Sequence, residues 1–149
     1  MDELSLREGI EDKIKQIDEY IKEVESFKPS NLNEYLEDTQ KKAACERYIE
    51  KIAESVVDLA ILFIRLKKLE SPEDDDTSFQ ILAGSNIITQ ELARKLRDLK
   101  GMRNRLAHRY EEVDDKSIFE AVNKEIEKDI NEFVNKIKNT IREKKNKTR

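Results

Sequence analysis

The segment IAESVVDLAILFIRL, residues 52–66, carries apolar side chains on more than one face of a helix. A helix that is apolar around much of its circumference is buried at the centre of a helical bundle or at an interface between subunits. The sequence leaves both interpretations open. Either one predicts that this segment organises the fold and that the other elements pack around it.

The helix that contains this segment is predicted to run from about residue 31 to about residue 69. Pro29 ends the preceding element, because proline cannot continue the backbone hydrogen bonds of a helix. Asn31, with Glu34 three residues later, resembles a capping box, which marks the start of a helix. The positions expected to face inward recur at helical spacing: Leu36, Ala43, Tyr48, Ile52, Val56, Leu59, Phe63 and Leu66.

Amphipathic helices are predicted on both sides of this central one. The helix over residues 2–27 has one apolar stripe, formed by Leu6, Ile10, Ile14, Ile17, Ile21 and Val24. An acidic loop at 71–76 lacks the ligand spacing of a calcium-binding loop, and a short helix follows over 77–83. Thr89 is predicted to cap a helix whose inward face is Leu92, Leu96, Leu99 and Leu106. Asp114 is predicted to cap the last helix, whose stripe is Ile118, Val122, Ile126, Ile130, Phe133, Ile137 and Ile141.

The composition supports an all-α fold. Charged residues make up 42% of the 149 residues, and the chain has only three Gly and two Pro. So few helix breakers, together with apolar residues at helical spacing, favour packed helices over disorder. We therefore predict an antiparallel bundle of about five helices, in a single domain that spans residues 1–149.

The charge pattern and the single cysteine limit the classes of function. A formal net charge of −4 gives no overall attraction for nucleic acid, so RNA would have to bind a local basic patch. The tail 136–149, with seven basic residues and one acid, is either such a patch or a solvated helix end. Cys45 alone excludes an intrachain disulfide, and the sequence has no Cys/His cluster for zinc. The sequence shows no apolar run long enough to span a membrane and no signal peptide, so we expect a cytoplasmic protein.

The run RNRLAHRY, residues 103–110, holds the only histidine of the chain, His108. An imidazole has an ordinary pKa of ~6.5 and exchanges protons near neutral pH. Arg103, five residues earlier, offers a planar guanidinium that suits a phosphate group. If the chain carries out chemistry, this run is where we expect it.

Arg103 falls near the centre of the inward face of its helix, which is an unusual place for a charge. A buried guanidinium is costly unless a carboxylate or a bound phosphate pairs with it. Glu46 or Asp58, on the long central helix, is the carboxylate we expect to pair with it. The alternative to a phosphate site is an ion pair that only fixes the register of the two helices.

Asn104 and His108 are four residues apart and therefore share a helix face, and Arg97 lies on the same stripe. These three side chains are placed to border a cleft beside Arg103. A lone histidine near a helix end is more often a capping or surface residue. The combination of Arg, Asn, His and Tyr within eight residues favours a site over that interpretation.

Cleavage of RNA without a metal needs a base for the 2′-hydroxyl, an acid for the leaving oxygen and a cation for the phosphorane. Arginine suits the last role. One histidine does not serve as base and acid in the same turnover, but a two-fold dimer would supply two histidines and two arginines. A nuclease interpretation therefore predicts a homodimer with a composite site, and no metal or cofactor.

The motif also resembles that of a known family. Arg103-x4-His108-x-Tyr110, preceded by Gly-Met, is similar to the R-x4-6-H motif of the HEPN superfamily in the extended form of its HepT-like branch. The predicted helix order resembles that branch over nearly the whole chain. The resemblance implies an all-α dimer that acts as a metal-independent endoribonuclease toxin, with a minimal nucleotidyltransferase antitoxin as its partner. It also implies Arg103 and His108 as the catalytic pair, Asn104 in support, and Tyr110 as the tyrosine that the antitoxin AMPylates to block activity.

Two other functions remain open from the sequence. In the first, the chain is a non-catalytic subunit that binds nucleotide or substrate for a minimal nucleotidyltransferase, and Arg103 and His108 grip phosphate without turning it over. In the second, the chain is a purely structural helical dimer, and Arg103 is locked in an ion pair. Loss of Arg103 would then cost several kcal/mol of stability, as breaking a buried pair does.

Overall fold

The structure is a computed structural model that describes the backbone of residues 2–147 and the side chains of residues 2–142. Its regular elements in this range are helices, so the all-α prediction is confirmed. The predicted basic tail 136–149 is helical to Lys147, and its side chains from residue 143 onward lie outside the described residues. No helix in the described part of the chain is long and apolar enough to cross a membrane.

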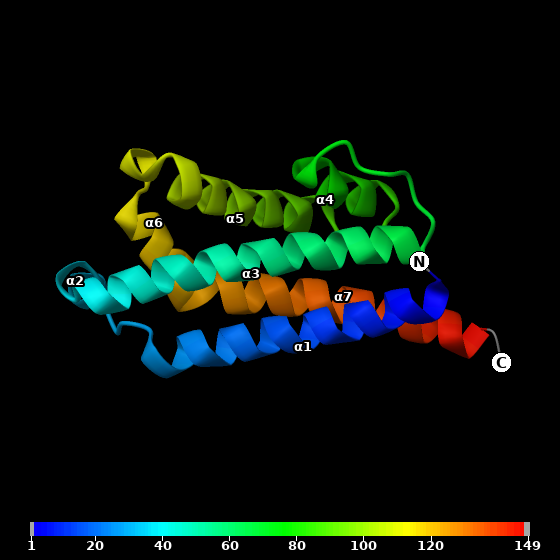
Figure 1. The fold of residues 1–149 in the computed structure, drawn as a ribbon, viewed down its shortest axis with the longest axis horizontal. Coiled ribbons are helices and arrows are strands. Elements are labelled where there is room, and N and C mark those ends of the chain that lie inside the picture. Colours follow the sequence, from blue (N-terminus) through cyan, green and yellow to red (C-terminus); the bar gives the residue numbers. More distant parts are fainter. Residues whose placement is uncertain (1, 148–149) are drawn as a thin grey trace.

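The long helices are arranged in alternating directions (Figure 1). These are α1 (Glu3–Phe27), α3 (Thr39–Leu66), α5 (Gln90–His108) and α7 (Ile126–Lys147). The short helix α4 (Asp75–Gly84) packs against α3 and α5. The antiparallel bundle that the sequence predicts is therefore present.

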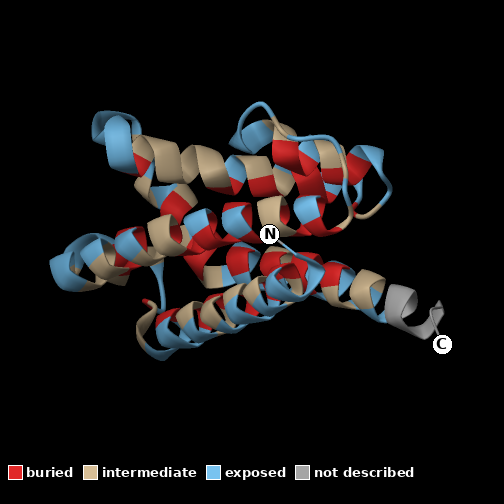
Figure 2. Ribbon diagram, turned by 45° about the vertical axis from the view of Figure 1, so that its right-hand side comes forward, coloured by how far each residue is buried: buried red, intermediate tan, exposed pale blue. Residues whose placement is uncertain are grey.

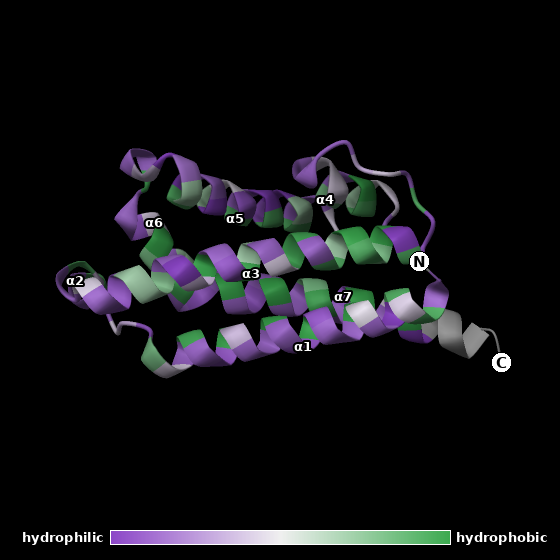
Figure 3. Ribbon diagram, in the orientation of Figure 1, coloured by the Kyte–Doolittle hydropathy of each residue, from purple (hydrophilic) through white to green (hydrophobic). Residues whose placement is uncertain are grey.

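Helix α3 is at the centre of the bundle, because it packs against α1, α4 and α5. Residues 52–66 are mostly buried within the chain itself, which confirms the bundle-centre interpretation of this segment. Buried residues line the facing sides of the helices, and exposed residues cover the outside (Figure 2). The hydropathy of the ribbon follows the same division (Figure 3). The largest fully buried side chains include Tyr35, Phe63, Phe79 and Phe133.

The helix predicted to start near residue 31 is two helices, because the chain breaks at Asp38. Asn31 caps α2 (Leu32–Glu37) by accepting a hydrogen bond from the Glu34 N–H, as predicted. Asp38 has an extended backbone and caps α3 in the same way. The break changes the helical phase, so Leu36 and Ala43, both predicted to face inward, are exposed, and Tyr35 is buried instead.

The last predicted helix is also interrupted. Asp114 caps α6 (Asp115–Glu120), and a π-helical turn at Ala121–Glu125 joins it to α7. The predicted stripe survives this change, since its members are buried except for the partly buried Ile141. Helix α4 begins two residues earlier than predicted, because Asp74 accepts hydrogen bonds from the Thr77 N–H and hydroxyl. The acidic loop therefore provides a helix cap.

Candidate active site at the end of α5

The motif 103–110 spans the end of α5 and the turn that follows it. Thr89 caps the start of α5 through the Leu92 N–H, as predicted. The helix continues to His108, so Asn104 and His108 do share one face. At Arg109 the backbone leaves the helical conformation, and a 3-10 turn, η1 (Tyr110–Glu112), begins. Tyr110 therefore projects from a turn and not from the helix.

Arg103 pairs with Glu54 on α3. Its Nε and Nη2 donate to Glu54 Oε1 at 3.2 and 3.0 Å. The Arg103 side chain is 30% exposed and that of Glu54 is 49% exposed. The prediction of a core position for Arg103 is therefore wrong, and so is the prediction of Glu46 or Asp58 as its carboxylate.

The antiparallel packing of α3 and α5 explains this choice of partner. Glu46 precedes Glu54 by eight residues on α3, and Tyr110 follows Arg103 by seven residues. Because the two helices run in opposite directions, Glu46 lies opposite Tyr110 when Glu54 lies opposite Arg103. The same register places Asp58 beyond Arg103, where it pairs with Lys13 on α1 at 3.4 Å.

Asp58 still lies near Arg103. The two side chains line a small hollow of about 150 Å³, which Lys100 and Asp75 also line. Lys100 pairs with Asp76 at 3.4 Å. This hollow places the guanidinium beside a mixed set of charges, with carboxylates and one ammonium group.

His108 is exposed, and its ring makes no hydrogen bond or ion pair within the described part of the chain. Five residues of α-helix place His108 about 140° around the axis from Arg103. Asn104 lies between them in direction, and Arg103 Nη1 approaches Asn104 Oδ1 at 3.4 Å. A single chain therefore presents the guanidinium and the imidazole on different sides of α5.

Arg97 is partly buried on the stripe of Asn104 and His108. Its Nε is buried and has no hydrogen-bond acceptor within the described residues. A buried donor without an acceptor costs free energy, and a ligand outside the chain would have to meet the other guanidinium nitrogens, since this one is covered. A supporting role of Arg97 in the site stays a prediction.

Sequence reasoning missed the partner of Tyr110. The Tyr110 hydroxyl donates to Glu46, whose Oε2 and Oε1 lie at 2.8 and 3.0 Å. Glu46 is only 9% exposed, whereas Tyr110 is 54% exposed. Burial raises the pKa of the Glu46 carboxyl, and the hydrogen bond to Glu46 is the main cause that raises the pKa of Tyr110. The helix register described above is the signal that could have found this pair.

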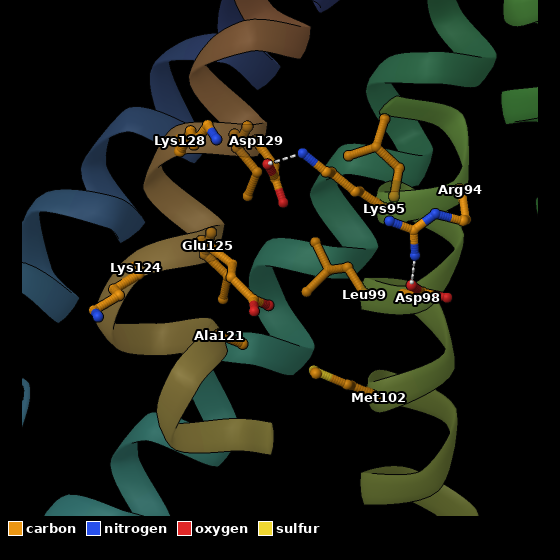
Figure 4. A pocket seen from close by; sticks show the side chains of 13 residues that line it. Arg94, Lys95, Asp98, Leu99, Met102, Ala121, Lys124, Glu125, Lys128 and Asp129 are labelled. Carbon is orange, nitrogen blue, oxygen red and sulfur yellow. Dashed lines mark hydrogen bonds and ion pairs between the residues drawn. The ribbon is translucent and has the colours of Figure 1, made fainter. Parts of the chain in front are cut away.

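A larger groove of about 510 Å³ lies on another side of α5, facing the π-helical turn and α7 (Figure 4). Leu99 and Met102 contribute apolar surface, and the ion pair between Lys95 and Asp129 spans the groove. No residue of the run 103–110 lines this groove, so it lies apart from Arg103, Asn104, His108 and Tyr110. Within the described residues, there is no cluster of three or more His, Cys, Asp or Glu that could hold a metal ion.

Comparison with known proteins places these features in context. Residues 17–137 match the family described as Ribonuclease HepT-like. The chain is 26% identical over 113 residues to a tRNA nuclease HepT of Aphanizomenon flos-aquae, covering 76% of this chain and 77% of the relative. It is 31% identical over 90 residues to an mRNA nuclease HepT of Shewanella oneidensis, covering 60% and 67%. The tri-AMPylated Shewanella oneidensis HEPN toxin, solved in complex with MNT antitoxin, superposes with a TM-score of 0.80 at 27% identity, covering 87% of this chain and 96% of that one.

Proposed function

We propose that this chain, which belongs to the Ribonuclease HepT-like family, is an endoribonuclease toxin that a nucleotidyltransferase antitoxin neutralises. The observation that carries the proposal is the match over residues 17–137, because this range contains the whole of α3, α5 and the motif. The relatives described as tRNA and mRNA nucleases support RNA as the substrate. Which RNA is cut is a separate property, since those two relatives differ in it.

Arg103 is the proposed cation for the phosphorane. Its ion pair with Glu54 is partly exposed, so a phosphate dianion or phosphodiester can displace the carboxylate at low cost. A guanidinium fork that binds one carboxylate also fits two phosphate oxygens. Asn104, which touches Arg103, would hold the guanidinium or the sugar in place. Arg97 and Asp58 border this region and are proposed as supporting groups only.

His108 is the proposed proton-transfer group, because its exposed imidazole is free to meet a substrate. Cleavage through the 2′-hydroxyl needs one group to take a proton and another to give one. A homodimer that brings together the ends of two α5 helices would provide both groups from two copies of His108. It would also place the Arg103 of one protomer near the imidazole of its partner. Within one α5 helix the two side chains point to different sides and cannot meet. We propose that this chemistry needs no metal.

Tyr110 is the proposed site of control. Its ring is more than half exposed at the turn after His108, so a partner enzyme can reach it. An AMP group on this residue would add bulk and a negative phosphate two residues from the imidazole. RNA phosphate would then be repelled from the site. The tri-AMPylated relative supports AMPylation as the kind of modification, and its placement on Tyr110 is our proposal.

The test is an RNA cleavage assay of the isolated chain and of His108→Ala. We expect the variant to lose cleavage of an RNA that the wild type cuts, while its circular dichroism and its elution volume stay unchanged, since His108 is exposed and unpaired. Full activity in the variant would overturn the proposal. Saturable nucleotide binding by the wild type, with no cleavage of total RNA, would instead favour the non-catalytic binding subunit.

A further inference from the structure

The Tyr110 hydroxyl is held by a buried carboxylate. Both oxygens of Glu46 lie within hydrogen-bond distance of this hydroxyl, at 2.8 and 3.0 Å. The two residues are 64 positions apart, and the contact joins α3 to η1. A hydroxyl nucleophile beside a carboxylate is an arrangement that enzymes use to activate the nucleophile.

The surrounding structure fixes both partners. The turn that carries Tyr110 is closed by the Glu112 N–H to the Arg109 carbonyl at 2.8 Å. Glu46 extends from a buried position near the start of α3. The hydroxyl therefore meets the carboxylate without rearrangement of the backbone.

A purely structural role does not explain why the acceptor is a carboxylate. Within the described residues, Tyr110 is the only hydrogen-bond partner of the Glu46 side chain, and the neighbouring Lys42 pairs with Asp115 at 3.1 Å. A buried carboxylate without its own cation is costly. A glutamine amide would accept the same hydrogen bond from Tyr110 with a smaller desolvation cost. Unlike a glutamine amide, the Glu46 carboxylate can also take the proton of the Tyr110 hydroxyl.

We propose that Glu46 accepts the Tyr110 hydroxyl proton while AMP is transferred to Tyr110. This inference rests on the proposed function, in which Tyr110 is the modified residue. The Tyr110 oxygen forms a bond to the α-phosphorus of ATP, and the bond from that phosphorus to the bridging oxygen breaks. Pyrophosphate leaves with the electron pair of the broken bond, and the phenolic proton moves to Glu46. The chain being modified thus supplies the base for its own modification.

The electrostatics agree with this role. A tyrosine phenol is neutral near pH 7 at its ordinary pKa, and the hydrogen bond to Glu46 raises that pKa further, so the phenol needs a base as it reacts. Burial raises the pKa of Glu46 and makes it a stronger base than a surface carboxylate. The hydrogen bond from Tyr110 and, after it, the charge of Lys42 oppose this rise in the pKa of Glu46, whereas Asp115 on α6 and Glu50 on α3 add to it.

The charges around Glu46 come from every element that packs there. Besides the groups named above, two neutral donors interact electrostatically with Glu46. These are the buried Tyr35 of α2 and the buried Cys45 of α3, and the pKa of each is raised. Neither competes with Glu46 as a base at neutral pH.

The experiment compares wild type with Glu46→Gln, each incubated with the cognate nucleotidyltransferase and Mg-ATP. Intact mass gives the rate of AMP addition, and Tyr110→Phe identifies the modified residue. We expect Glu46→Gln to slow the first AMP addition about 10²-fold or more, as loss of a general base does. The affinity for the partner, measured by titration, should stay within about twofold of wild type.

The matched control is Glu23→Gln. Glu23 accepts a hydrogen bond from the Tyr48 hydroxyl, so this variant alters another Tyr–Glu pair, away from the motif. It should be modified at the wild-type rate. The pH profile is a second readout, and it uses wild type if Glu46→Gln does not fold. The rates of wild type and of Glu23→Gln should both fall as the pH drops through the raised pKa of Glu46, and wild-type and Glu23→Gln rates that stay flat over this range would overturn the inference. Glu46→Gln, where it folds, should lack this fall.

The outcomes separate the two levels of the argument. If wild type gains no AMP on Tyr110, the proposed modification fails and this inference fails with it. If wild type is modified and Glu46→Gln is modified equally fast or faster, only the inference on Glu46 is overturned. A slow Glu46→Gln variant beside a normal Glu23→Gln control supports it.

Discussion

Replacing Arg103 with alanine separates a catalytic role from a structural one. The ion pair of Arg103 with Glu54 is 30% and 49% exposed, so water screens it. Ion pairs of this kind contribute about 0.2–1 kcal/mol to stability. We therefore expect Arg103→Ala to lower the free energy of unfolding by about 1 kcal/mol. If the guanidinium stabilises charge in the transition state, its loss slows cleavage about 10²–10³-fold, or about 3–4 kcal/mol.

Two assays on the same samples measure these quantities. Urea unfolding at one fixed protein concentration gives stability, since an oligomer makes the midpoint depend on concentration. Single-turnover RNA cleavage gives the chemical step. Glu54→Gln is the matched control, because it removes the same ion pair and keeps the guanidinium. It should match Arg103→Ala in stability and retain cleavage.

Two results would refute this reasoning. An unfolding cost of about 3–5 kcal/mol for Arg103→Ala would mean that the pair behaves as a buried one. Equal loss of cleavage in Arg103→Ala and Glu54→Gln would mean that cleavage depends on the intact ion pair and not on the guanidinium as a cation for the transition state. Either result would favour the structural role of Arg103.

Two further predictions follow from the contacts of the acidic residues on α3. Glu54→Gln should tighten RNA binding by up to about fivefold, because Arg103 no longer has to release a carboxylate worth about 1 kcal/mol or less; filter binding would measure this, and weaker binding would contradict it. Glu46→Gln should be more stable than wild type near pH 7, because the pKa of Glu46 is raised in the folded chain and its ionised form therefore opposes folding. This stability advantage of Glu46→Gln should shrink as the pH falls through the raised pKa, because wild-type Glu46 is then protonated. Thermal unfolding between about pH 4 and about pH 7 would measure it, and a variant less stable than wild type near pH 7 would contradict the prediction.

Much of the fold could be predicted from sequence because it depends on local signals. The stripes of α1 and α5 have one apolar face each, and Asn31, Thr89 and Asp114 each cap a helix at the predicted start, although the helix after Asn31 is short. The break at Asp38 was missed because the pattern on both sides is helical. An aspartate there can cap a new helix or lie within a continuous one, and only packing decides.

The partners in the candidate site could not be predicted in the same way. Glu46, Glu50, Glu54 and Asp58 recur every four residues along α3, so they form one ridge that turns by about 40° around the helix at each step. The periodicity of α3 alone cannot say which of them meets Arg103, because a slip of one turn between α3 and α5 exchanges one for the next. The choice of Glu54 is set by the packing of buried residues from several helices at once. The core prediction for Arg103 failed because its long side chain reaches the surface from a position beside the apolar face.

The same face of α3 serves both ends of the motif, and this links the proposed activity to its proposed control. Glu54 holds the guanidinium, and Glu46, about two turns earlier, holds the phenol. The partly exposed Glu54 pair is cheap to open, which suits a cation that must exchange its partner for RNA phosphate. The buried Glu46 pair is costly to leave without its donor, which suits a contact that keeps one hydroxyl in place until it reacts. The difference in burial between two glutamates on one helix therefore distinguishes a replaceable contact from a fixed one.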